Sequence, residues 1–264
     1  MGGSDHEKSM TGAKRFWIDS LPEVSGTVSL TGTEAHHVRN VLRLSLGDLV
    51  ELVSSTGRQA MARIYEIDRS GVKLIVENLQ PAENEPPLSI VLGLAVLKAD
   101  RMDWVVQKAT ELGLSALIPV TADRSVVQLE QERAAKRTER WRQIARQAVK
   151  QCRRGRAPEV AAPVNLKSFF DICLKHEVKI VLHEAAEHHA SNSWANLQNL
   201  FDRPQTVAAL VGPEGGFTNH EIMLAREAGF SVLGMGPRIL RAETAALALL
   251  AVIGFLWGDL ANFS

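Results

Sequence analysis

The sequence is poor in cysteine and shows no excess of charge of either sign. Its 264 residues hold two cysteines, Cys152 and Cys173, with no Cys-x-x-Cys motif and no histidine at ligand spacing. This excludes a disulfide framework and a zinc site, and it indicates a cytoplasmic protein. Lysine and arginine together number 30, as do aspartate and glutamate, so the formal net charge is zero. A protein whose whole surface is basic is therefore excluded.

Long apolar runs are also missing. The best candidate for a membrane span covers 13 residues, from Ala245 to Trp257. A helix needs about 20 apolar residues to cross a bilayer, so this segment predicts a buried helix and no membrane partner. Residues 1–15 are polar and charged, without the apolar centre of a signal peptide, and are expected to form a disordered tail.

Hydrophobic residues make up 45% of the chain, which is enough for a large buried core. Short alternating runs punctuated by glycines predict a small β-barrel over residues 16–80, interrupted by one helix that begins at Thr33. The polar, proline-bearing residues 81–87 predict a linker. Over residues 88–264, apolar runs alternate with helical stretches. This pattern predicts an α/β domain whose mostly parallel sheet is covered on both faces.

The zero net charge conceals one strongly basic segment. Between Arg133 and Arg156, ten lysines and arginines accompany a single acid, Glu139, so the segment carries +9 and the rest of the chain −9. An ordinary surface helix would explain a run of charge, but such helices normally mix both signs. The natural partner of this segment is a phosphate backbone.

Two glycine-rich turns follow predicted strands. The first lies in VAALVGPEGGF (residues 207–217), after which Thr218 and Glu221 form a capping box at the start of a helix. The second lies in LGMGPRILRAETA (residues 233–245). Open α/β sheets bind ligands at the carboxyl ends of strands, where glycine lets the backbone approach closely. One such turn could be purely structural, whereas two on consecutive strands favour a ligand site. The phosphate-loop and dinucleotide motifs are both absent.

These turns resemble the SPOUT superfamily of S-adenosyl-L-methionine-dependent RNA methyltransferases, and more narrowly the ribosomal RNA small subunit methyltransferase E family. HHVRNVLRLSLGD (residues 36–48), KADRMDWVVQKATELG (98–113) and QCRRGRAPEV (151–160) occur in the family's order and spacing. The resemblance implies a PUA-like RNA-binding β-barrel at 16–80 and a methyltransferase domain with a deep trefoil knot at 88–264. It also implies a homodimer that methylates N3 of a uridine in 16S ribosomal RNA, within the assembled small subunit.

The resemblance also implies that backbone groups of the knot loops hold the cofactor. Glu214 would meet the methionine amino group or the ribose, or else be a solvated acid of the turn. The residues expected to contact the cofactor are Leu182, His183, Glu184, Leu210, Val211, Gly212, Pro213, Glu214, Gly216, Leu233, Gly234, Met235, Gly236, Ile239, Leu240, Arg241 and Thr244.

Methylation of a uridine N3 requires the imide proton to leave, so some group must accept it or stabilise the anion. Glu243 is the acid nearest the second turn and could act as the base, or it could compensate the dipole of the last helix. Arg154 and Arg241 could instead stabilise the developing anion. The sequence leaves these possibilities open, with Glu243 and Arg154 as the catalytic candidates.

Guided by the family resemblance, we expect the RNA contacts to extend beyond the basic segment along both halves of the chain. They are Arg39, Arg43, Lys98, Arg101, Lys108, Arg153, Arg154 and Arg156. His36 and His37 are adjacent and have no third ligand, so no metal site is expected.

Two rival functions follow from the same residues. One is an RNA-binding assembly factor that kept the fold and lost catalysis. The glycines at 212, 215, 216, 234 and 236 argue against it, because an inactive pocket would not need them. The other is an enzyme that methylates a ribose hydroxyl or another base, which would share the same cofactor site.

Overall fold

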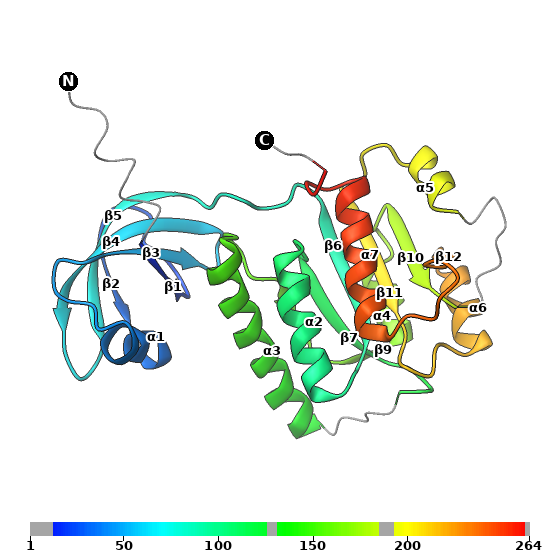
Figure 1. The fold of residues 1–264 in the computed structure, drawn as a ribbon, viewed down its shortest axis with the longest axis horizontal. Helices are drawn as coiled ribbons and strands as arrows, with labels where there is room; N and C mark the ends of the chain where they lie inside the picture. Colours follow the sequence, from blue (N-terminus) through cyan, green and yellow to red (C-terminus); the bar gives the residue numbers. More distant parts are fainter. Residues whose placement is uncertain (1–12, 126–130, 185–192, 262–264) are drawn as a thin grey trace. The chain divides into compact units, whose positions relative to one another are not determined.

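The structure is a computed structural model that describes residues 13–125, 131–184 and 193–261. The chain forms two compact units, drawn in Figure 1. Unit 1 comprises Met1–Glu85 and Val149–Arg156, and unit 2 comprises Pro86–Ala148 and Ala157–Ser264. The boundary after Glu85 lies within the predicted linker. Residues 149–156, expected in the second domain, instead belong to the first unit.

Unit 1 is built on a five-stranded sheet in the order β1-β3-β4-β5-β2. Strand β1 runs parallel to β3, and the other neighbours are antiparallel. The strands are β1 (Lys14–Ile18), β2 (Thr27–Leu30), β3 (Leu49–Ser54), β4 (Arg58–Ile67) and β5 (Val72–Pro81). Alternating side chains such as Val50 and Leu52 are fully buried together with Phe16, which gives the unit its own core.

Two sequence-based expectations for unit 1 are wrong in detail. Lys14 and Arg15 were assigned to a disordered tail, but they pair with Val50 and Glu51 of β3. Residues 1–12 lie outside the described residues. The helix begins earlier than expected, because Thr31 is the N-cap and accepts the first helical hydrogen bond through its carbonyl. It comprises α1 (Gly32–His36) and a π-helical turn, η2 (His37–Val41).

Unit 2 is built on a seven-stranded sheet in which every pairing is parallel, as the uninterrupted apolar runs predict. The order is β12-β10-β11-β6-β7-β8, and β9 also pairs with β7. The strands are β6 (Ser89–Ala95), β7 (Ala116–Thr121), β8 (Glu159–Val160), β9 (Val164–Asn165), β10 (Val178–Leu182), β11 (Thr206–Val211) and β12 (Ser231–Leu233).

Helices cover both faces of this sheet, with separate cores on each side (Figure 1). Helices α2 (Ala99–Glu111) and α7 (Ala242–Leu256) pack on one face with the unit 2 part of α3 (Gln131–Cys152). Helices α4 (Leu166–Ile172) and α6 (Asn219–Glu227) pack on the other. The remaining helix is α5 (Trp194–Leu200). In α2, Met102, Val105, Val106 and Ala109 recur at helical spacing and are buried.

The longest apolar run of the sequence lies on α7, as expected. Ala246, Leu249, Leu250 and Ile253 are fully buried on one face of this helix, whereas Phe255 is 63% exposed. Within the part of the chain that the structure describes, no helix is both long and apolar enough to cross a membrane.

The predicted capping box at the start of α6 is confirmed. The Thr218 hydroxyl accepts a hydrogen bond from the Glu221 amide, and the Glu221 carboxylate accepts one from the Thr218 amide at 2.7 Å. The same carboxylate accepts the amide of Asp123 at 2.8 Å. Because three backbone and hydroxyl groups converge on a buried acid, the end of the first glycine-rich turn is fixed in place.

Candidate functional site

A cavity of about 440 Å³ opens in unit 2 where three neighbouring strands end. Leu182, Val211 and Leu233 are the last residues of β10, β11 and β12, and all three line it. Parallel pairing forces these carboxyl ends onto one edge of the sheet. The two glycine-rich turns, expected to contact one ligand, therefore do enclose a single space.

The cavity is lined by all but two of the residues predicted to contact the cofactor. Leu210 is 1% exposed and packs in the core against α4 and α6, because alternate residues of a strand face opposite sides of the sheet. Thr244 is exposed on α7. The sequence prediction missed five lining residues: Phe217, Pro237, Arg238, Ala242 and Ala245. Ala242 and Ala245 are three apart and share a helix face, a spacing that could have revealed them.

Two glycines in the turns are required by geometry. Gly236 has φ +80°, a backbone conformation that side chains strongly disfavour. A Cβ on Gly212 would lie 3.0 Å from the ring of Phe217. Each turn thus keeps a backbone path that another residue would disturb, which explains why glycine was a useful signal at these positions.

Two side chains outside the predicted set support the turns. The Trp194 indole donates to the Gly234 carbonyl at 3.1 Å, and the Arg124 guanidinium donates to the Gly215 carbonyl at 3.0 Å. Both residues lie far from the turns in sequence, and no local pattern marks them. They help to hold the second and the first turn, respectively.

Charged groups cluster beside the cavity. Glu214 lines it, and the Arg101 Nη1 donates to Glu214 Oε1 at 3.0 Å. The Arg101 Nε lies 3.7 Å from Oε1 of Glu243, in the first turn of α7. Arg101 was expected to contact RNA, but its guanidinium lies between two carboxylates. The basic side chains of the lining itself are His183, Arg238 and Arg241.

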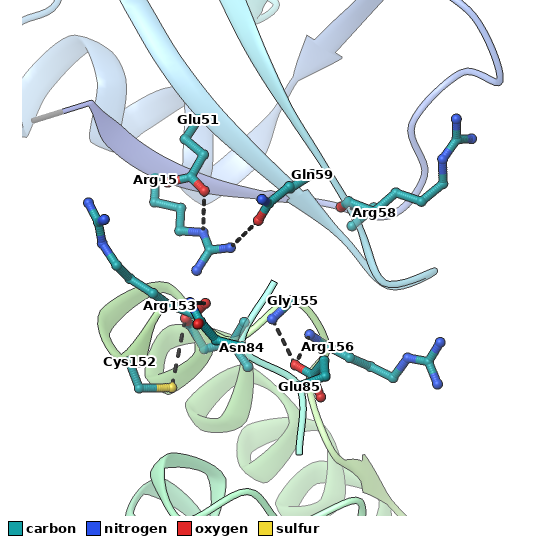
Figure 2. Close-up of polar contacts among 12 residues, drawn as sticks. Arg15, Glu51, Arg58, Gln59, Asn84, Glu85, Cys152, Arg153, Gly155 and Arg156 are labelled. Atoms are coloured by element: carbon teal, nitrogen blue, oxygen red, sulfur yellow. Dashed lines mark hydrogen bonds and ion pairs between the residues drawn. The ribbon is translucent and has the colours of Figure 1, made fainter. Parts of the chain in front are cut away.

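Arg154, a candidate for both catalysis and RNA binding, lies in unit 1 and is held there by Glu85. Its side chain is 6% exposed, and its Nη2 lies 2.9 Å from Glu85 Oε2. Glu85 Oε1 also accepts the amides of Gly155 and Arg156 at 2.7 and 2.8 Å, as Figure 2 shows for Gly155. The structure therefore gives the buried Arg154 side chain a structural ion-pair partner, and its predicted catalytic and RNA-binding roles stay predictions.

A second arginine is buried close to this turn. The Arg15 Nε lies 3.4 Å from Glu51, and its Nη2 donates to Gln59 at 3.3 Å (Figure 2). Burial lowers the pKa of Arg15, while Glu51 opposes that effect. By contrast, Arg153 and Arg156 are exposed, and Figure 2 shows their side chains extending away from the turn.

Two acids from elsewhere in the chain, Glu34 and Asp103, and the segment's own Glu139 pair with cations of the basic segment. Lys150 pairs with Glu34 at 2.7 Å, with only 8% and 17% of the two side chains exposed. Arg140 pairs with Asp103 at 2.6 Å, and Glu139 lies within 4 Å of both Arg142 and Arg146. The count of one acid among ten cations therefore overstates the charge that the segment presents to solvent.

The remaining residues expected to bind RNA fall into two groups. Arg39 donates to the Asp68 carbonyl, and Lys108 pairs with Glu111 at 2.8 Å. Arg43 and Lys98 are exposed, like Arg153 and Arg156. These four are the predicted cations whose side chains are best placed to meet a phosphate.

The described residues contain no group of three or more histidines, cysteines or acids that could hold a metal ion. Cys152 and Cys173 are both free thiols. Burial raises the pKa of Cys173 to about 12, so this thiol stays protonated at neutral pH and has no nucleophilic role.

Comparison with known protein families matches both units. Residues 84–254 match the model of an RNA methyltransferase domain, and residues 30–77 match that of an RNA methyltransferase PUA domain. The two matches together cover most of the described chain.

Similar proteins extend the match over nearly the whole length. The ribosomal RNA small subunit methyltransferase E of Bacillus subtilis is 32% identical over 254 residues, which cover 92% of this chain and 96% of that protein. A Legionella pneumophila protein solved with the bound cofactor SAM is 32% identical, with a TM-score of 0.85 over 94% of this chain and all of that one. A Neisseria gonorrhoeae ribosomal RNA small subunit methyltransferase E bound to S-adenosyl methionine is 31% identical, with a TM-score of 0.83 over the same shares.

Proposed function

Because this chain belongs to the ribosomal RNA small subunit methyltransferase E family, we propose that it transfers a methyl group from S-adenosyl-L-methionine to N3 of one uridine in 16S ribosomal RNA. The observation that carries the proposal is the cavity at the ends of β10, β11 and β12. Most of its lining residues come from the two glycine-rich turns that resemble the family, and Leu182, His183 and Glu184 come from the end of β10. The chain is therefore an S-adenosylmethionine-dependent RNA methyltransferase of the small ribosomal subunit.

The cavity fits this cofactor in size and in chemistry. A volume of about 440 Å³ lies within the range typical of small-molecule sites. Backbone groups of the turns suit an adenine edge, and the apolar side chain of Ile239, 82% exposed at the lining, suits its face. Arg238 and Arg241 are matched in charge to the cofactor's carboxylate, and Glu184 and Glu214 to its ammonium group.

The finer fold proposal is a trefoil knot that closes around this cavity. Strand β12 lies at the edge of the sheet beside β10, yet the next helix, α7, packs against α2 and β11. The chain must therefore return from the edge across the strand ends. The segments on either side of that return, 211–217 and 233–241, line the same cavity. This arrangement supports the knot that the family resemblance implies.

The chain's own groups account for the steps that accompany methyl transfer. When bound, the cofactor supplies an electrophilic methyl group on a sulfonium, so the main task of the protein is to align donor and acceptor. The turns hold the donor by their backbone, which needs no rearrangement during the reaction. Glu243, in the first turn of α7, accepts the N3 proton of the uracil. The positive charge of Arg241 stabilises the anion that forms.

We propose that the RNA docks through exposed cations, most of which belong to the PUA unit. Arg43, Arg153 and Arg156 are the exposed members of the predicted set in unit 1, and Lys98 is the exposed member in unit 2. Since the buried ion pairs of Arg154 and Lys150 remove those two charges from the surface, the phosphate contacts fall to the remaining side chains. The proposed substrate is the folded RNA of the assembled small subunit.

Two copies of the chain are proposed to form a homodimer. Helix α7 buries one face, yet Phe255 is 63% exposed and Ala251 and Val252 are half-buried on the same helix. A helix that is apolar on more than one face favours a partner surface.

The first prediction concerns cofactor affinity. In Gly236→Ala the Cβ has no neighbour within 4 Å, so the cost of roughly 1–2 kcal/mol comes from the backbone conformation alone. A backbone that relaxes away from φ +80° moves the groups that hold the cofactor, and we expect titration calorimetry to give a dissociation constant about tenfold higher. Gly229→Ala is the matched control, because Gly229 has φ +85° but follows α6 outside the lining. Wild-type protein that gives no heat with either the cofactor or its demethylated product would contradict the assignment.

The second prediction concerns RNA docking. The double variant Arg153→Glu/Arg156→Glu should lower methylation of small subunits at least tenfold, because two phosphate contacts become repulsive. Cofactor affinity should stay within twofold of wild type. Arg226→Glu, a reversal at an exposed position of α6, serves as the control. Unchanged methylation by the double variant would show that these arginines do not form the docking surface.

The third prediction concerns assembly. Light scattering coupled to size-exclusion chromatography should give twice the mass of one chain for the wild type. Phe255→Glu places a charge on the proposed contact and should shift the protein toward a single chain. A monomeric wild type at micromolar concentration would refute the dimer.

A further inference from the structure

Three charged side chains meet beside the cavity from three separate elements of unit 2. Arg101 comes from the amino-terminal part of α2, Glu214 from the turn after β11, and Glu243 from the first turn of α7. Their side chains are 30%, 28% and 13% exposed, so Glu243 is the one most withdrawn from solvent. The cluster joins the first glycine-rich turn, the start of α7 and α2.

The Arg101 guanidinium interacts with Glu214 and Glu243 in different ways. Arg101 Nη1 and Glu214 Oε1 are 3.0 Å apart and form a hydrogen-bonded ion pair. Arg101 Nε and Glu243 Oε1 are 3.7 Å apart, which is too long for a hydrogen bond but short enough for strong charge attraction. Glu214 therefore anchors the arginine, and the arginine holds the Glu243 carboxylate by charge without using its lone pairs.

The second oxygen of Glu243 lacks a partner. Oε2 is buried and accepts no hydrogen bond from any group in the described residues. An ionised oxygen in that position carries a desolvation cost that a donor would relieve. Ala242 and Ala245, on either side of Glu243 in the helix, line the cavity. Glu243 is not itself among the lining residues, so its carboxylate has to turn toward the cavity before the free lone pairs of Oε2 can meet a ligand N–H.

The charge of the cluster also opposes the role first expected for Arg101. One cation and two carboxylates carry a net charge of −1, which repels an RNA phosphate and suits a cationic cofactor. Without the guanidinium, Glu214 and Glu243 would repel each other, and the start of α7 would lose one of its contacts with α2. Arg101 is thus placed to hold the acids and not to bind the RNA backbone.

We propose that Arg101 is a positioning residue for methyl transfer, which orients the Glu243 carboxylate so that Oε2 can take the N3 proton of the uracil. This inference rests on the proposed function. In the step, the N3–H bond breaks and the proton passes to Oε2. The freed N3 electron pair then forms the new bond to the methyl carbon, and the carbon–sulfur bond of the donor breaks with its electrons retained by sulfur.

The test is a double-mutant cycle on methylation of purified small subunits. Arg101→Gln and Glu243→Gln should each lower kcat about 100-fold, the size expected for loss of a general base. The KM for the subunit and the calorimetric affinity for the cofactor should stay within threefold. The double variant Arg101→Gln/Glu243→Gln should be no slower than the slower single variant, because both changes remove the same function, proton transfer to Glu243. Arg101→Lys, which keeps the charge, should recover at least tenfold over Arg101→Gln.

Other outcomes would overturn the inference. A raised KM with unchanged kcat would make Arg101 an RNA contact. Effects that multiply in the double variant would show that Arg101 does not act through Glu243. Weaker cofactor binding and a lower melting temperature in both Arg101→Gln and Arg101→Lys would make its role purely structural. Arg226→Gln controls for loss of an exposed arginine. If wild-type protein binds the cofactor but does not methylate the subunit, the proposed function itself fails, and this inference fails with it.

Discussion

Parallel hydrogen bonding among β12, β10 and β11 is the constraint on which the site depends. It places the carboxyl ends of three strands side by side, so residues as far apart in the chain as Leu182 and Ala245 enclose one cavity. The glycine-rich turns that follow β11 and β12 are held by separate contacts. The Glu221 capping box follows the first turn, and the Trp194 indole donates a hydrogen bond to the second. The result is a cavity whose two glycine-rich turns are each held by contacts from other parts of the chain.

Ion pairs reduce the number of cations of the basic segment that are available to RNA. The chain has no net charge, and its basic segment contains ten lysines and arginines but one acid in sequence. In the folded protein, however, Glu34 and Glu85 bury Lys150 and Arg154 within the PUA unit. Asp103 pairs with Arg140 in the methyltransferase unit, although the Arg140 side chain stays 66% exposed. What remains for RNA is a smaller set of exposed cations, which is consistent with docking at a defined place and not with indiscriminate binding of polyanions.

The sequence predicted well those features that depend on residues close together in the chain. Apolar runs located the strands, Thr218 and Glu221 marked the capping box, and glycines marked the turns that line the cavity. The features it missed depend on contacts between distant residues. These are the pairing of Lys14 and Arg15 with β3, the ion pair of the buried Arg154 with Glu85, and the ion pairs of Arg101 with two acids. A one-dimensional pattern shows that Arg101 is charged, but not which carboxylates meet it.

Methylation of N3 of one uridine in the small-subunit RNA can be measured in the cell. Mass spectrometry of 16S ribosomal RNA should be compared between the source strain, a strain that lacks the protein, and that strain supplied with the gene again. We expect one 3-methyluridine to disappear from the deletion strain and to return on complementation, with other modifications unchanged. An unaltered set of methylated nucleotides in the deletion strain, or loss of a ribose methyl group instead, would contradict the proposed function.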